Sequence, residues 1–198
     1  MSSISTINIV PRLKELNIRV VTPTSLSKIF GITNQNTIYK IIERMEKYKL
    51  LERLIKGKYI LSDAKMSDFE KAGVVLSPSY ISLESALSFY GILAQFSYSI
   101  TSVTTQKSKK YIIDNKEYEY TKISQKFFSD YIKKDNFLIA SPEKALVDLI
   151  YLASKKLRKI EIPDLDMSII NWDLFNKLRV KIDYIPFQNY LEQNKLYD

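Results

Sequence analysis

The stretch from Thr33 to Tyr48 constrains the fold most, because one helix with two chemically different faces accounts for it. Its apolar residues recur at the i, i+3, i+4, i+7 spacing of a helical face: Ile38, Ile41, Ile42 and Met45. Thr33 or Asn34 can cap the N-terminus, since either side-chain oxygen accepts an otherwise unpaired backbone N–H. The other face holds amides, hydroxyls and cations, which suit base edges and phosphates. A solvated amphipathic helix has the same pattern, so the neighbouring segments must decide between the two interpretations.

A shorter helix precedes this stretch. Thr22-Pro23-Thr24 marks its start, its apolar face is Leu26, Ile29 and Phe30, and Gly31 can adopt the positive φ that ends a helix. Two helices joined by a tight glycine-containing turn are typical of a helix-turn-helix, in which the second helix contacts bases. The pattern from Ile4 to Ile18 is also loosely helical. We expect that helix to begin near Pro11, because proline is tolerated in a first turn.

After Lys49 the hydrophobic period changes from about 3.6 to about 2, which indicates strands. The extended runs 50–55 and 58–61 are separated by Lys56-Gly57-Lys58, a glycine turn suited to a hairpin. A basic hairpin after a recognition helix predicts a winged helix, with its tip at a phosphate backbone or minor groove. The predicted DNA-contacting residues are Asn34, Gln35, Asn36, Thr37, Tyr39, Lys40, Arg44, Lys56 and Lys58.

The charge distribution favours the same interpretation. The chain has a net charge of +8, and residues 1–62 contribute eleven Lys/Arg against four Asp/Glu. Residues 63–198 contribute nineteen against eighteen, so almost all of the excess lies in the first third. A basic domain joined to a nearly neutral one is typical of a nucleic-acid-binding protein with a second function.

The remaining residues predict a mixed α/β domain over 79–198, joined by a linker over 63–78 that includes a helical turn near Met66 to Lys71. Helix starts are indicated at Ser82, which we expect to act as a cap, and at Ser141-Pro142-Glu143. Two short C-terminal helices are also expected. Strands are predicted at 97–105, 110–113, 117–123 and within 131–140, with a hairpin turn at 114–116. With residues 1–62 as the winged helix, the predicted fold class is α+β.

A cationic run follows the second of these helices: Lys155, Lys156, Arg158 and Lys159. Cations stabilise a helix C-terminus, which is the simpler explanation, and a second DNA contact is the alternative.

Composition argues against catalysis. The chain has no cysteine and no histidine, so it lacks thiolate nucleophiles, the commonest general base and the commonest metal ligands. No P-loop, GxGxxG, HExxH or nucleophile elbow is present. The carboxylate pairs Glu143/Asp148 and Asp164/Asp166 are the first to examine, and both have structural explanations. We therefore expect a protein that is not an enzyme and has no cofactor or metal.

No apolar run is long enough for a membrane span and no signal peptide is indicated, so we expect a cytoplasmic location.

Three stretches of the second domain carry a resemblance to a known family: PSYISLESALSFYGI (78–92), ITSVTTQKSKKY (100–111) and IASPEKALVDLIYL (139–152). Together with the preceding winged helix they resemble the AbiEi antitoxins of phage-defence operons, over about residues 10–155. The resemblance implies that the N-terminal domain binds inverted repeats in its own promoter and represses the operon. It also implies that the C-terminal domain counteracts a nucleotidyltransferase-like toxin, without a stable complex, as in type IV toxin–antitoxin systems.

The DNA-binding role implied by the resemblance falls on Asn34 to Arg44 and on the two hairpin lysines, whereas the antitoxin role cannot be assigned to residues. Two alternatives remain open. One is a winged-helix regulator that senses a ligand or protein and has no toxin partner. The other is an enzyme that processes nucleic acid through its second domain.

Overall fold

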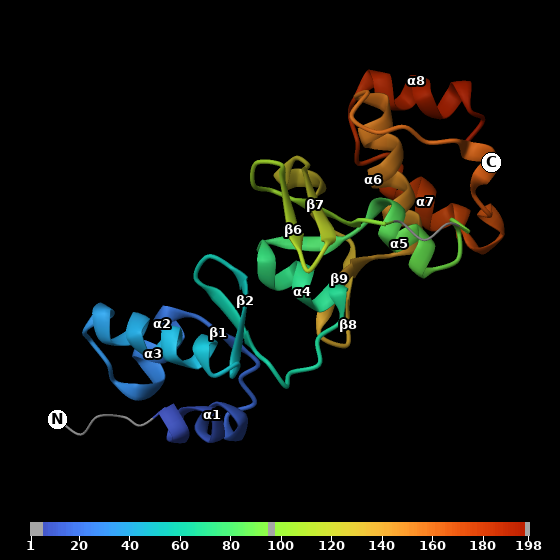
Figure 1. Cartoon of the computed structure of the whole chain (residues 1–198). Helices are drawn as coiled ribbons and strands as arrows, with labels where there is room; N and C mark the ends of the chain where they lie inside the picture. The colour runs from blue at the N-terminus through green and yellow to red at the C-terminus, as the bar shows by residue number, and fades with distance from the viewer. Residues whose placement is uncertain (1–5, 95–97, 197–198) are drawn as a thin grey trace. The chain divides into compact units, whose positions relative to one another are not determined.

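The computed structural model describes residues 6–94 and 98–196, and the chain folds as two units, 1–67 and 68–198 (Figure 1). The boundary differs from the predicted linker over 63–78, because helix α4 (Asp68–Val75) lies within that segment and packs in the second unit. Its residues Ala72 and Val75 are buried there. Within the described residues no helix is long and apolar enough to cross a membrane.

The first unit consists of three helices and a small antiparallel sheet. Its elements in chain order are α1 (Thr6–Glu15), β1 (Val20–Val21), α2 (Pro23–Phe30), α3 (Gln35–Lys47), β2 (Leu51–Ile55) and β3 (Lys58–Leu61). The strands are ordered β1-β3-β2, so β3 is central. The two predicted extended runs therefore form the hairpin β2–β3, and the helices α2 and α3 are consecutive.

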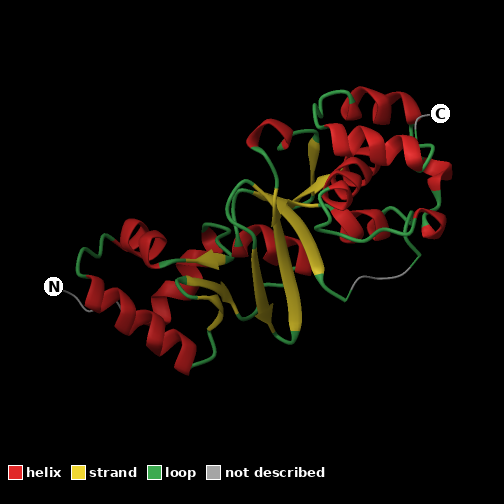
Figure 2. Ribbon diagram, turned by 90° about the horizontal axis from the view of Figure 1, so that it is seen from above, coloured by secondary structure: helices red, strands yellow, loops and turns green. Residues whose placement is uncertain are grey.

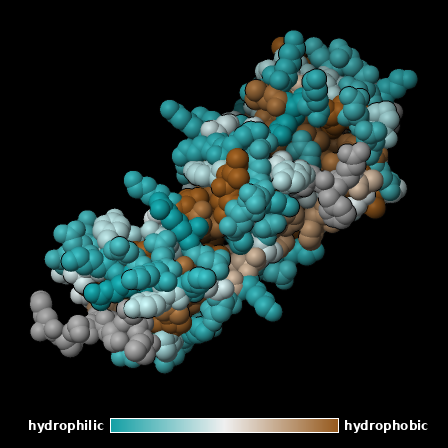
Figure 3. Space-filling view, viewed as in Figure 1, coloured by the Kyte–Doolittle hydropathy of each residue, from teal (hydrophilic) through white to brown (hydrophobic). Residues whose placement is uncertain are grey.

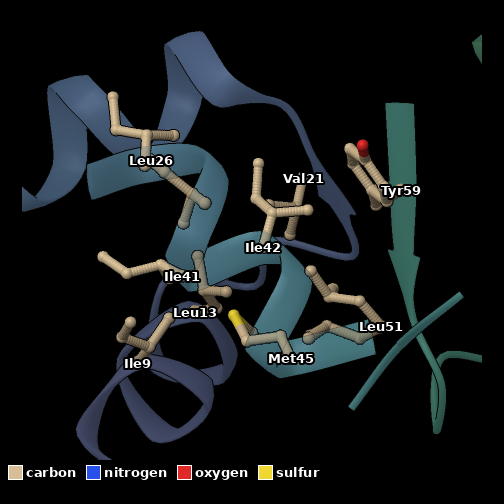
Figure 4. Packing of buried hydrophobic residues seen from close by; sticks show 11 residues of the cluster. Ile9, Leu13, Val21, Leu26, Ile41, Ile42, Met45, Leu51 and Tyr59 are labelled. Atoms are coloured by element: carbon tan, nitrogen blue, oxygen red, sulfur yellow. The ribbon is translucent and has the colours of Figure 1, made fainter. Parts of the chain in front are cut away.

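The predicted apolar face of α3 forms the centre of the core of this unit. Ile38, Ile41, Ile42 and Met45 are each at most 5% exposed. They belong to one core cluster, and Figure 4 shows Ile41, Ile42 and Met45 of this face packed with residues of the other elements, which include Ile9, Leu13, Val21, Leu26, Leu51 and Tyr59. The helical periodicity of this stretch is thus confirmed, and its opposite face remains available to solvent.

The prediction that the first helix begins near Pro11 is wrong, since α1 begins at Thr6 and contains Pro11. Proline has no N–H, so the helix loses one bond to the carbonyl of Ile7. Ile9 and Leu13, one turn apart, are both fully buried, and burying each such side chain contributes about 1.5–3 kcal/mol. Tertiary burial thus outweighs the local cost. Ile4 lies outside the described residues.

The predicted helix ends of α2 and α3 are formed by specific side chains. Thr22 Oγ1 accepts from the backbone N–H of Ser25 at 3.0 Å, and Ser25 Oγ accepts from Thr22 N–H at 2.9 Å. Gly31 ends α2 with φ +64°. Asn34, rather than Thr33, caps α3, because its Oδ1 accepts from the N–H of Thr37 at 3.2 Å.

The second unit is a mixed six-stranded sheet covered by helices, so the protein is α+β (Figure 2). The strand order is β6-β7-β5-β4-β9-β8. Its strands are β4 (Ser79–Ile81), β5 (Ile100–Thr104), β6 (Lys109–Ile113), β7 (Lys116–Lys122), β8 (Tyr131–Lys134) and β9 (Phe137–Ala140). Its helices after α4 are α5 (Leu83–Phe89), α6 (Pro142–Ser154), α7 (Trp172–Arg179) and α8 (Ile185–Gln193), with short 3-10 turns at Gln125–Phe127, Ile162–Asp164 and Met167–Ile169.

Several details differ from the expectations for this unit. The segment 131–140 forms two strands, because Asp135 adopts φ +50° and turns the chain. Strand β5 begins at Ile100, and Ser97, the start expected for it, lies outside the described residues.

The hairpin turn at Asp114-Asn115 is confirmed, with φ +50° and +60°. Ser141 caps α6 as predicted, by accepting from Lys144 N–H at 3.2 Å.

The structure brings the three stretches of the resemblance together in one buried hydrogen-bond network. The first stretch supplies Tyr80 and Ser82, the second Thr101, and the third Lys144 and Asp148. Ser82 is not a side-chain cap, because its Oγ donates to Asp148 at 2.8 Å instead, while Thr101 Oγ1 donates to the Ser82 carbonyl at 2.8 Å. These polar residues are at most 3% exposed, so here the three stretches determine the fold.

Candidate nucleic-acid interface

Helix α3 presents its predicted contact residues to solvent. All seven positions named from Asn34 to Arg44 are exposed, and Tyr39 is 54% exposed although it is aromatic. Hydrophilic residues cover most of the visible face of the first unit (Figure 3). Because successive helical residues are about 100° apart, Asn36 and Lys40 lie opposite the buried face, with Gln35 and Tyr39 to one side and Arg44 to the other.

The turn between β2 and β3 places two lysines at the end of the hairpin. Ile55 pairs with Lys58, so Lys56 and Gly57 form a two-residue turn, and Gly57 has φ +79°. That left-handed conformation is the reason for glycine here. Lys56 is exposed and Lys58 is half-buried, and burial lowers the pKa of the Lys58 ammonium.

A groove of about 620 Å³ joins the hairpin end to the two helices. Its lining includes four of the predicted contact residues, Gln35 and Tyr39 of α3 together with Lys56 and Lys58 of the hairpin. The structure does not place every predicted residue in it. Asn36, Thr37, Lys40 and Arg44 are exposed outside the groove lining, and the Asn34 side chain is engaged as the cap of α3.

Sequence reasoning missed the contribution of α2 to this groove. Thr24, Ser27 and Lys28 line it, and Thr33 lies at its edge before α3. Lys28 is an exposed cation beside two apolar residues, Ile29 and Phe30, that pack against the core. The available signal was its position in the predicted helix-turn-helix, since the first helix of such a motif crosses the DNA backbone.

The groove is electropositive. None of its lining residues is an acid, and three are lysines. Among residues 6–94 and 98–196, no acid pairs with Lys28, Lys40, Arg44 or Lys56, whereas Lys14 pairs with Asp63 and Arg12 with Glu15. Cations without acidic partners in a concave surface attract anions.

Two of the four residues in the cationic run of the second unit, Arg158 and Lys155, contact other residues of that unit. Arg158 bonds Thr121 Oγ1 at 3.0 Å and pairs with Glu119 at 2.8 Å and Glu84 at 3.7 Å. Lys155 Nζ lies 4.8 and 5.2 Å from the ring centroids of Tyr151 and Tyr184. Lys156 and Lys159 are exposed.

Three of the four carboxylates considered for chemistry have structural partners. Glu143 accepts from Ser141 Oγ at 2.9 Å and from Asn171 N–H at 3.1 Å. Asp148 belongs to the buried network, and Asp166 accepts from Ser168 N–H at 2.9 Å. Asp164 is exposed at the end of a 3-10 turn.

No protein-family model matches the chain, and no curated protein matches it either.

Proposed function

We propose that the protein binds double-stranded DNA in a sequence-specific manner through its first unit, a winged helix with α3 as recognition helix and β2–β3 as wing. The observation that carries this proposal is the groove without acids that joins the N-terminal turn of α3 to Lys56 and Lys58. The element order α1-β1-α2-α3-β2-β3 supports it, since a helix-turn-helix followed by a hairpin is the arrangement expected of a winged helix.

The chemistry of α3 suits base recognition. Amide side chains such as those of Gln35 and Asn36 can bond bidentately to adenine, and cations such as Lys40 and Arg44 can bond to guanine or phosphate. The first unit also has nearly all of the net charge, which supplies the sequence-independent part of the affinity.

We propose further that the protein is the antitoxin and autorepressor of a type IV toxin–antitoxin operon for phage defence, with a nucleotidyltransferase-like toxin as functional partner. The resemblance of the three stretches to AbiEi antitoxins supports this, and the buried network in which they meet accounts for their role in the fold.

Binding to duplex DNA from upstream of the protein's own coding sequence tests the DNA-binding proposal, with a shuffled duplex of equal composition as control. Specific proteins bind their sites at least about 10³-fold more tightly than other DNA. Equal affinity for the two duplexes would contradict a sequence-specific role. Coexpression with the neighbouring reading frame tests the antitoxin role: growth inhibition by that frame that this protein does not relieve would exclude it.

A further inference from the structure

The groove has cationic residues on two separate elements. Lys28 comes from α2, whereas Lys56 in the β2–β3 turn and Lys58 at the start of β3 form the end of the hairpin, which lies across from α2 and α3 (Figure 1). We propose that Lys28 and the turn lysines contact the same sugar–phosphate strand of bound DNA, which lies in the groove between them. This inference rests on the proposed DNA-binding function and specifies how its site engages the duplex.

The groove hydroxyls suit a phosphate ligand. Two are engaged within the protein: Thr22 Oγ1 accepts from Ser25 N–H at 3.0 Å, and Ser27 Oγ donates to the Ile32 carbonyl at 2.7 Å. The exposed hydroxyls of Thr24 and Thr33 have no hydrogen-bond partner in the described part of the chain. Lysine ammonium groups and threonine hydroxyls are common donors to DNA phosphates.

The size of the groove favours one strand. A volume of about 620 Å³ is within the range of small-molecule sites, so the groove has room for a short stretch of sugar–phosphate backbone. The half-buried Pro23 also lines the groove and offers apolar surface against which sugar carbons can pack.

With the strand in the groove, different residues of α3 would contact the backbone and the bases. Gln35 and Tyr39 line the groove and would lie beside the held strand. Asn36 and Lys40, about 100° further round the helix, would face the base edges. Separate phosphate contacts on two strands would instead need the hairpin to point away from α2, and the shared groove argues against that.

Single neutral methylphosphonate linkages, placed one at a time along both strands of the bound duplex, test this inference. The parent protein should lose affinity at one or two adjacent linkages of one strand. In Lys28→Ala and in Lys56→Ala the loss of affinity caused by those same linkages should become smaller. Each variant should also reduce the slope of log affinity against log salt by about 0.9, the value for one phosphate.

Lys49→Asn is the matched control. It removes the same charge after the far end of α3, and asparagine tolerates the left-handed backbone of Lys49, where φ is +54°. It should leave the linkage pattern unchanged. The inference is wrong if Lys28→Ala and Lys56→Ala silence linkages on different strands, or if Lys28→Ala retains the parental salt slope. A parent protein that binds no duplex contradicts the proposed function itself. Thermal melts establish that the exposed-site variants are folded.

Discussion

Lys144 and Asp148, one turn apart on α6, form an ion pair whose side chains are only 4% and 3% exposed. The other carboxylate oxygen of Asp148 accepts from Tyr80 at 2.9 Å and from Ser82 at 2.8 Å. The Lys144 ammonium also lies 5.7 Å from the centroid of the Tyr80 ring. The pair therefore ties α6 to the strand β4 and to the start of α5, near the centre of the second unit.

Removing one member of this pair should destabilise the protein strongly. Lys144→Met leaves a buried carboxylate without its cation, and such a loss costs about 3–5 kcal/mol. Asp148→Asn leaves a buried ammonium and should have a similar cost. The double variant should be less destabilised than the sum of the two, because neither charge is then left alone. Urea unfolding of all four proteins measures the interaction energy, and strict additivity would show that the two charges do not interact.

Many helices and strands of this fold can be predicted from local sequence patterns. The contacts between residues far apart in the sequence cannot. The spacing of Ile38, Ile41, Ile42 and Met45 predicts α3, because the helical repeat places residues three and four positions apart on one face, and that face is buried. Ser82, by contrast, has the local signature of a cap, yet it bonds to Asp148, 66 positions away. Pro11 is misjudged for the same reason, since the burial of Ile9 depends on the tertiary core. Lys28 belongs to the candidate site through a groove that forms only when α2 and the hairpin come together.

The first unit should fold and bind DNA as a separate fragment. Its core residues come from its own elements, so a fragment of residues 1–67 retains the complete cluster around α3. Circular dichroism melting should show a cooperative transition, and the fragment should bind duplex DNA with a steep salt dependence. The fragment should not relieve growth inhibition by the proposed toxin. As a control, Ile41→Asp should abolish folding, because an unpaired buried carboxylate is costly. A fragment that melts without cooperativity would show that the unit depends on residues 68–198.

Asn36→Ala should reduce specificity more than affinity. The Asn36 side chain is exposed on α3 outside the groove, and loss of one bidentate base contact removes about 1–3 kcal/mol of discrimination. Binding to random duplex should remain nearly parental. Lys56→Ala should behave in the opposite way, weakening both duplexes alike. Paired titrations of operator and random DNA distinguish the two variants. If the ratio of the two affinities is unchanged in Asn36→Ala, this residue does not take part in base recognition.

The half-buried Lys58 should make DNA binding sensitive to alkaline pH. Burial lowers the pKa of its ammonium, so the free protein loses this proton before an ordinary lysine does. A phosphate contact requires the charged form. Affinity should therefore fall as pH rises through the lowered pKa, by at most about tenfold per pH unit for one proton. Without DNA the sign is reversed: the folded state binds this proton less tightly than the unfolded chain, so stability should rise between the lowered pKa and the ordinary one.

Lys58→Arg separates this effect from general alkaline weakening, because a guanidinium remains charged throughout the range. The variant should retain its affinity at alkaline pH while the parent loses it, and Lys56→Arg, at the exposed neighbour, is the matched control. Fluorescence anisotropy with one labelled duplex, at constant ionic strength between pH 7 and pH 10, measures the affinity of the parent and of each variant. If the parent and Lys58→Arg lose affinity in parallel, the titrating group lies elsewhere and Lys58 does not contact phosphate. If only the parent loses affinity, the ammonium of Lys58 is in contact with the DNA backbone in the complex.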